Sequence, residues 1–258
     1  SMPFLFLIVG LLTVPPRLGY RFPRRPPRLH ALLLILALAT GTIVFIIVDE
    51  IFNYSIPWNF NAVASKFFVV YNQFLLVTTT CCITLSLLSF AEEYKNAPST
   101  NFIDNIQDIN ERIEGFMSDY GSWRCLCVIL YYAVVLTVEL FLLQQHTANR
   151  SISYLVQYWM PWLVLDLGSL FLVNYAAQRV HLAFEKALKD VILEQRTVLG
   201  RTKAFHNAIH HLRAAAEQER PRIPAGWFFT LGMPTFGSIV LSIFTYFIIL
   251  VQFRQGEE

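Results

Sequence analysis

The sequence predicts an all-α protein that crosses a membrane several times, and three observations support this prediction. Of the 258 residues, 55% are hydrophobic and the mean hydropathy is +0.48, which is more apolar surface than one soluble core of this size can cover. The apolar residues form separate segments, most of them near the ~20 residues that a helix needs to span a bilayer. The stretches between them are charged, and their basic residues are typical of cytoplasmic loops.

The N-terminal part contains a short apolar run, a basic connector and one clear span. Residues 4–14 are apolar but barely long enough to cross a membrane. Residues 15–30 carry five arginines among several prolines, which predicts a stiff cytoplasmic connector. Residues 31–48 then form a span, and the loop at 49–61 that follows has no lysine or arginine.

Three further spans are expected in the middle of the chain. A long one covers 62–91, and the next two cover 125–143 and 154–175. The polar stretch from about 92 to 124 has isoleucines at helical spacing, which predicts an amphipathic cytoplasmic helix. These isoleucines are Ile103, Ile106, Ile109 and Ile113.

Two glycosylation acceptors agree with the distribution of basic residues. Asn53 and Asn149 each begin an Asn-X-Ser triplet, and both lie in loops that the arginine distribution independently places outside. About six crossings result if residues 4–14 span the membrane, and about five if they do not. In both cases the C-terminus is expected outside.

The stretch 176–225 carries nine of the twenty lysines and arginines. An apolar residue recurs in it every seven positions, at Phe184, Val191, Val198, Phe205 and Leu212. This pattern predicts one long amphipathic helix with a coiled-coil-like stripe on the cytoplasmic side. Gly200 weakens the helix and is a candidate bend, and Pro221 and Pro224 end it.

The last apolar segment, 226–253, has its polar residues in a single line. Thr235, Ser238, Ser242, Thr245 and Gln252 share one face of a 3.6-residue helix, and Ile249 fills the gap in their spacing. A stripe of this kind in a membrane span is typical of a helix–helix interface or of a water-filled pore. The pattern alone leaves both interpretations open.

Motifs for enzymatic chemistry are missing from the sequence. It contains no phosphate-binding glycine loop, no nucleophile elbow and no HExxH, so neither an enzyme nor a cofactor is expected. His206, His210 and His211 have helical spacing but no acidic or cysteine partner on their face, which favours a solvated helix surface over a metal site. Because membrane sidedness accounts for the basic residues, no nucleic-acid binding is expected.

Polar and aromatic residues gather toward the outer ends of the spans. Glu139 and Asp166 are charges within consecutive spans, which makes them candidates for a ligand pocket or for structural pairing. The aromatic and amide side chains near the same level are equally consistent with a pocket and with an interfacial aromatic belt. The candidate pocket residues are Tyr71, Gln73, Glu139, Tyr158, Trp159, Trp162 and Asp166.

The end of the last segment resembles the closing signature of the insect gustatory receptors. Thr245-Tyr246, five apolar residues and then Gln252-Phe253 match the pattern TY-x5-QF, and Phe229-Thr230-Leu231-Gly232 is similar to the start of that family's last helix. The family has seven spans, with the N-terminus inside and the C-terminus outside. The order of spans in this chain matches spans two to seven and lacks the first.

The resemblance implies a plasma-membrane, ligand-gated cation channel that assembles as a homo- or hetero-tetramer and detects a small organic tastant. It divides the chain into spans and an outer pocket (1–175, with a helical insert near 92–124), an anchor helix (176–225), and a pore-lining span with its outside end (226–258). Phe247 stands where sugar receptors commonly carry Glu. The expected pore and gate residues are Ser238, Ser242, Thr245, Ile249, Gln252 and Phe253.

Two other functions remain alternatives. The first alternative is a non-conducting, truncated subunit or an interaction protein of the same family, which the missing first span favours. A small-solute transporter is disfavoured, because the polar stripe is confined to one helix and no inverted repeat is visible.

Overall fold

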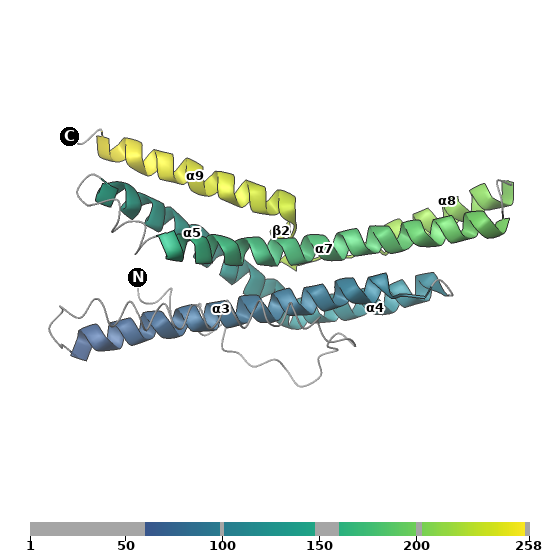
Figure 1. The fold of residues 1–258 in the computed structure, drawn as a ribbon, viewed down its shortest axis with the longest axis horizontal. Helices are drawn as coiled ribbons and strands as arrows, with labels where there is room; N and C mark the ends of the chain where they lie inside the picture. The colour runs from purple at the N-terminus through teal and green to yellow at the C-terminus, as the bar shows by residue number, and fades with distance from the viewer. Residues whose placement is uncertain (1–59, 99–100, 148–159, 200–202, 256–258) are drawn as a thin grey trace.

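The computed structural model describes residues 60–98, 101–147, 160–199 and 203–255, which form long helices and one small β-hairpin (Figure 1). The predicted all-α class is confirmed. In chain order the elements are α3 (Phe60–Lys95), α4 (Phe102–Phe116), the π-helix η1 (Met117–Gly121), α5 (Ser122–Thr147), α7 (Met160–Leu199), α8 (Lys203–Gln218), β1 (Pro224–Ala225), β2 (Phe229–Thr230) and α9 (Met233–Gln255).

The amphipathic helix expected near 92–124 is α4, and it continues through η1 into α5. Ile106, Ile109 and Ile113 are buried on one face of α4, as their spacing predicted. The single π-turn of η1 shifts the helical register between the charged α4 and the apolar α5. One continuous helical rod therefore joins the polar and the apolar parts of the molecule.

The single helix predicted over 176–225 is wrong, because the structure has two helices there. α7 starts at Met160 and runs without a break to Leu199, and α8 returns alongside it (Figure 1). At the end of this return, Arg220 Nη2 lies 3.2 Å from Glu185 Oε1 in the middle of α7. Gly200 lies between the two helices, where its low helix propensity and the burial gained by folding back both favour a break.

In the described part of the chain, the apolar stripe that repeats every seven residues packs inside the molecule. Phe184 and Val191 are buried, and Leu212 of α8 is half-buried against the same cluster. The ring of Phe184 meets the ring of Tyr94 from α3 edge-on, with centroids 5.8 Å apart. Two stripe residues have side chains outside the described set, Val198 and Phe205.

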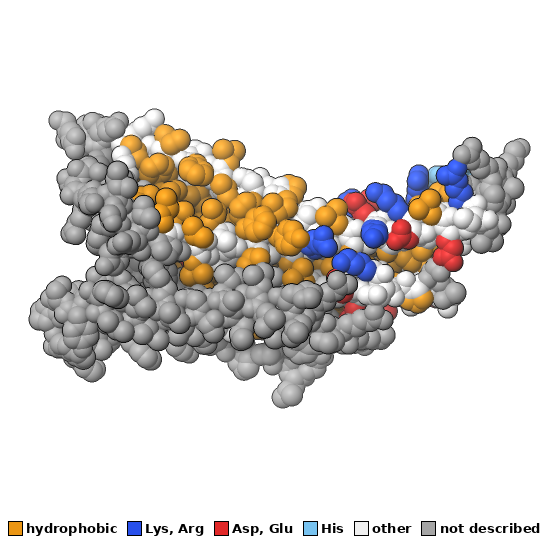
Figure 2. Space-filling model, viewed as in Figure 1, with side chains coloured by type: hydrophobic (Ala, Val, Ile, Leu, Met, Phe, Trp, Pro, Cys, Tyr) orange, Lys and Arg blue, Asp and Glu red, His pale blue; other side chains and the backbone are white. Residues whose placement is uncertain are grey.

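Charged and apolar surfaces occupy opposite ends of the molecule. Figure 2 shows hydrophobic side chains over α9 and the first half of α7, and lysines, arginines and acidic residues over the end formed by α7 and α8. Within the residues that the structure describes, three helical segments are long and apolar enough to cross a membrane: Leu76–Lys95, Phe102–Phe141 and Met233–Phe253. The span expected at 154–175 is not among these three and stays a prediction.

Several predictions concern residues that the structure does not describe. The spans at 4–14 and 31–48 and the acceptors Asn53 and Asn149 lie outside the described residues. The sidedness of the chain therefore stays a prediction.

The last apolar segment does not form a helix from its beginning. Residues 224–230 form the antiparallel hairpin β1–β2, in which Pro224 pairs with Thr230, and α9 starts only at Met233. Gly226 at the turn has φ +59°, a conformation that favours glycine. A Cβ added there would lie 2.7 Å from Leu126 Cδ2 of α5, so a larger residue would have to displace the Leu126 side chain as well as adopt the positive φ.

Candidate pore helix and polar cluster

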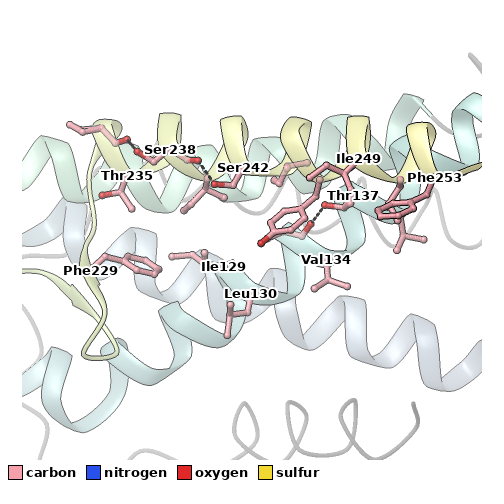
Figure 3. A pocket seen from close by; sticks show the side chains of 17 residues that line it. Ile129, Leu130, Val134, Thr137, Phe229, Thr235, Ser238, Ser242, Ile249 and Phe253 are labelled. Atoms are coloured by element: carbon pink, nitrogen blue, oxygen red, sulfur yellow. Dashed lines mark hydrogen bonds between the residues drawn. The ribbon is translucent and has the colours of Figure 1, made fainter. Parts of the chain in front are cut away.

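A groove of about 730 Å³ runs between α5 and α9, and much of the polar stripe lies along it (Figure 3). Thr235, Ser238 and Ser242 line the groove from α9, followed by Ile249 and Phe253 toward the C-terminus. The opposite wall comes from α5 and is mostly apolar, with Ile129, Leu130, Val134 and Thr137 among its residues. Two of the predicted pore residues, Thr245 and Gln252, are exposed on α9 and are not part of this lining.

The orientation of α9 follows from its one fully buried apolar residue, Ile243, which is 4% exposed. Nine residues separate Ile243 from Gln252, which places their side chains about 180° apart on a 3.6-residue helix. Thr245 lies about 160° from Ile243 by the same geometry. The C-terminal end of the polar stripe therefore faces away from the helices of its own chain.

Four hydroxyls of the stripe donate hydrogen bonds within α9 or to the linker before it. Ser238 donates to the Pro234 carbonyl at 3.1 Å, Ser242 to the Ser238 carbonyl at 2.9 Å and Thr245 to the Leu241 carbonyl at 2.9 Å. Thr235 donates to the Thr230 carbonyl at 2.6 Å. A hydroxyl has only one proton to donate, so none of these four donors ties α9 to α5.

α9 is the least buried of the three candidate membrane segments that the structure describes. Only 6% of its span is buried within the chain, against 61% for the span in α3. Its exposed residues include Leu241, Phe244, Tyr246 and Ile248, and Phe253 near its end is 73% exposed. Exposed apolar area of this extent in a membrane helix requires lipid or further protein around it.

Glu139 and Asp166 lie near each other, on α5 and α7 respectively. Asp166 is 1% exposed and is close enough to act electrostatically on Glu139 and on Tyr131. Glu139 is half-buried, and its Oε2 has no hydrogen-bond partner among the residues that the structure describes. These two acidic side chains form a polar cluster between α5 and α7, and their role in a ligand pocket stays a prediction.

The other predicted pocket residues cannot be placed relative to this cluster. Tyr71 and Gln73 lie on α3 ahead of Leu76, the first residue of that helix whose side chain is described. Trp162 lies in the first turn of α7, with its side chain outside the described set. Tyr158 and Trp159 lie outside the described residues altogether.

The start of α9 is held by side chains that the sequence did not single out. Asn174 and Gln178 of α7 accept hydrogen bonds from the backbone N–H groups of Gly232 and Met233. The one sequence signal that could have identified them is their spacing of four residues, which places both on one face of a helix. Their partners, more than fifty residues further along the chain, could not be read from it.

Candidate metal ligands do not cluster in the described part of the chain. No three histidine, cysteine or acidic side chains come together there in an arrangement that would hold a metal ion. His206, His210 and His211 are exposed on α8, with the rings of His210 and His211 6.2 Å apart and nearly perpendicular. The four cysteines are free thiols: Cys81, Cys125 and Cys127 are buried, and Cys82 is exposed.

Comparisons with known proteins point to one family. The family model described as 7tm chemosensory receptor matches residues 101–257. The insect olfactory receptor OR5 from Machilis hrabei has a similar fold, with a TM-score of 0.58 and 14% identity over 98% of this chain and 75% of that receptor. The structure of OR5 in complex with eugenol has a TM-score of 0.52 and 12% identity, over 98% and 70% of the two chains. No curated protein sequence matches this chain.

Proposed function

The chain belongs to the 7tm chemosensory receptor family, whose model covers more than half of it, and from this premise we propose that it is a gustatory-type, ligand-gated cation channel with α9 as its pore helix. It is a helical membrane protein and a non-enzyme, like the insect receptors that share its fold. The proposal adds the permeating ion, the pore helix, the assembly and the class of ligand.

The orientation of α9 is the observation that carries the pore assignment. The C-terminal part of its polar stripe, Thr245 and Gln252, turns away from the buried Ile243, and the helix is almost unburied within one chain. Copies arranged around an axis would cover the exposed apolar flanks of α9 and direct Thr245 and Gln252 toward that axis. A tetramer in the plasma membrane, formed by this chain alone or with related subunits, satisfies this arrangement.

The gate in this proposal lies at the C-terminal end of α9. Gln252 and Phe253 are consecutive and therefore about 100° apart around the helix. A small rotation exchanges an amide for an aromatic ring at the axis, and a ring of phenyl groups can close a pore by dewetting it. Both side chains are exposed within one chain, which leaves them free to take these positions.

The ligand is proposed to be a small organic tastant bound beside Glu139 and Asp166. A half-buried acid next to a fully buried one, in largely apolar surroundings, provides the few polar groups that orient such a ligand. OR5, which shares the fold, has been solved in complex with eugenol. Eugenol is therefore the first compound to test as a probe of this chain.

Cysteine accessibility during whole-cell recording tests the pore assignment. A Thr245→Cys channel should be blocked by a charged methanethiosulfonate reagent, because position 245 faces the pore. A Phe244→Cys channel is the matched control, since Phe244 is also exposed on α9 but lies about 100° away around the helix. The unsubstituted chain measures the background from the native cysteines.

Two outcomes would overturn the proposal. Block of both cysteine variants to the same extent would show that α9 does not present the stripe to the pore. Complete absence of cation current from surface-expressed chains, with eugenol and with a wider panel of tastants, would favour the non-conducting subunit instead.

A further inference from the structure

The linker between α8 and α9 is fixed on one side to the start of α5. Gly226 donates its backbone N–H to the Ser122 carbonyl at 3.0 Å, and Ser122 Oγ donates to the Gly226 carbonyl at 3.1 Å. Both residues are buried. This reciprocal pair closes the hairpin β1–β2 onto α5 and leaves little freedom at its turn.

The same linker is fixed on its other side to α7. Asn174 Oδ1 lies 3.3 Å from the Gly232 nitrogen, and Gln178 Oε1 lies 3.4 Å from the Met233 nitrogen. Asn174 is fully buried, and its Nδ2 donates to the Leu170 carbonyl at 2.9 Å, which orients the amide with its oxygen toward the linker. The imidazole of His181, one turn further along α7, lies close to the backbone of Leu231.

These contacts supply what the start of a helix lacks. The first backbone N–H groups of a helix have no acceptor within it and are usually capped by a side chain at its own N-terminus. In α9 the residue before the helix is Gly232, which has no side chain, and Pro234 has no N–H. Asn174 and Gln178 therefore cap α9 from the neighbouring helix.

The capping residues Asn174 and Gln178 lie on the same face of α7 as Asp166 of the polar cluster. Asp166, Leu170, Asn174 and Gln178 follow one another at intervals of four residues. Eight residues, or about 12 Å of helix, separate Asp166 beside Glu139 from Asn174 at the start of α9. Because α7 is unbroken from Met160 to Leu199, displacement at one end of this row is carried to the other.

From this geometry we propose that Asn174 and Gln178 are positioning residues that couple movement of α7 to the base of α9 and so set the opening of the pore. The proposal rests on the function proposed above. With the hairpin held on α5 and the helix start held on α7, a shift of α7 relative to α5 tilts α9 about the short stretch 226–232. Gly226, with its positive φ, and Gly232 lie at the two ends of that stretch.

Isosteric variants of Gln178 separate capping from packing. Gln178→Met keeps the size of the side chain and removes the acceptor, whereas Gln178→Glu keeps an acceptor oxygen. Leu182→Met, at a 47% exposed position one turn further along α7, is the control for changes elsewhere on that helix. The full-length chain is used throughout, and no ligand is needed.

We expect hydrogen–deuterium exchange and the ligand-free cation current to change in the same variant. Hydrogen–deuterium exchange of peptides covering 223–236 should accelerate in Gln178→Met and stay as in the parent chain in the other two variants. The ligand-free cation current per surface channel should change by about threefold or more in Gln178→Met, the factor expected from losing one hydrogen bond. It should stay near the parent value in Gln178→Glu and Leu182→Met.

Each contrary result has a distinct meaning. Unchanged exchange in Gln178→Met overturns the cap, whatever the current does. Accelerated exchange with an unchanged current overturns the coupling and leaves the proposed channel function intact. Absence of current in every variant, the parent included, overturns the channel function and the gating role together, while the exchange experiment still decides whether α7 caps α9.

Discussion

Arg112 of α4 and Glu93 of α3 form an ion pair of 2.5 Å, with side chains that are 5% and 6% exposed. Removing one partner of such a pair leaves a buried charge, which costs about 3–5 kcal/mol. Arg112→Met should therefore lower the thermal unfolding temperature of the detergent-solubilised chain strongly, and Arg112→Met with Glu93→Leu should recover much of the loss. Equal unfolding temperatures for the single and double variants would show that the pair is not coupled.

The seam between α7 and α8 is the next point to test. Val191→Asp introduces a charge at a position that is 7% exposed and should destabilise the end of the molecule formed by these helices by several kcal/mol. Leu193→Asp, two residues away and 56% exposed, should have little effect. Fluorescence-detected size exclusion after a heating series measures both variants, and equal losses would argue against an intramolecular seam.

Gly226 should resist substitution more than Gly237 of α9. Gly226→Ala forces a Cβ against Leu126 at a positive φ and should cost at least about 1 kcal/mol of stability. Gly237→Ala is the control, because a Cβ there meets nothing within 4 Å and alanine favours an exposed helix. The prediction fails if the two variants unfold at the same temperature.

Acidification should weaken the region where α7 meets the linker. Burial lowers the pKa of His181 below the ordinary histidine value, because it disfavours the charged imidazolium, and nearby Arg220 acts in the same direction. The unfolded chain therefore binds this proton more readily than the folded chain, and stability falls as the pH drops below about 6.5.

The measurement is the unfolding temperature between pH 7.5 and 5.5, a range above the titration of ordinary carboxylates. The parent chain should lose stability across this range, whereas His181→Gln should respond less. A variant with the same pH response as the parent would assign the effect to another group.

Substitution near the C-terminal end of α9 is expected to change ion permeation. Gln252→Ala should alter basal conductance or the ratio of sodium to potassium permeability with little loss of surface protein, because Gln252 is exposed within one chain. Bi-ionic reversal potentials measure the selectivity. Loss of surface expression at unchanged selectivity would instead identify Gln252 as a residue that ties neighbouring helices together.

Local patterns in the sequence predicted the elements, and contacts between distant residues decided the rest. The isoleucines of α4 and the apolar run of α9 have the helical spacing that burial or a membrane imposes, so both helices could be expected. The apolar stripe keeps its spacing of seven residues from Val191 to Leu212. The sequence pattern therefore gave no sign that the chain reverses direction between α7 and α8. The stretch from Gly226 to Gly232 is part of the apolar run, and the sequence therefore predicted that it begins a membrane span. In the structure its backbone forms hydrogen bonds with α5, with α7 and within the hairpin.

The candidate site was less predictable than the fold. The line of hydroxyls on α9 is a local pattern and was visible in the sequence. Its direction depends on which residue is buried, and only the packing of Ile243 against the rest of the chain fixes that. The cap formed by Asn174 and Gln178 joins residues 58 and 55 positions apart, a separation that no periodicity encodes.

The hydroxyl protons of Ser238, Ser242 and Thr245 are all committed to carbonyls within α9. What these side chains offer outward is therefore lone pairs alone. An anion travelling along such a surface meets no donor to replace its lost water, whereas a sodium or potassium ion meets oxygen after oxygen. Along the turns that carry these hydroxyls, a pore lined by α9 would disfavour chloride without a single fixed negative charge.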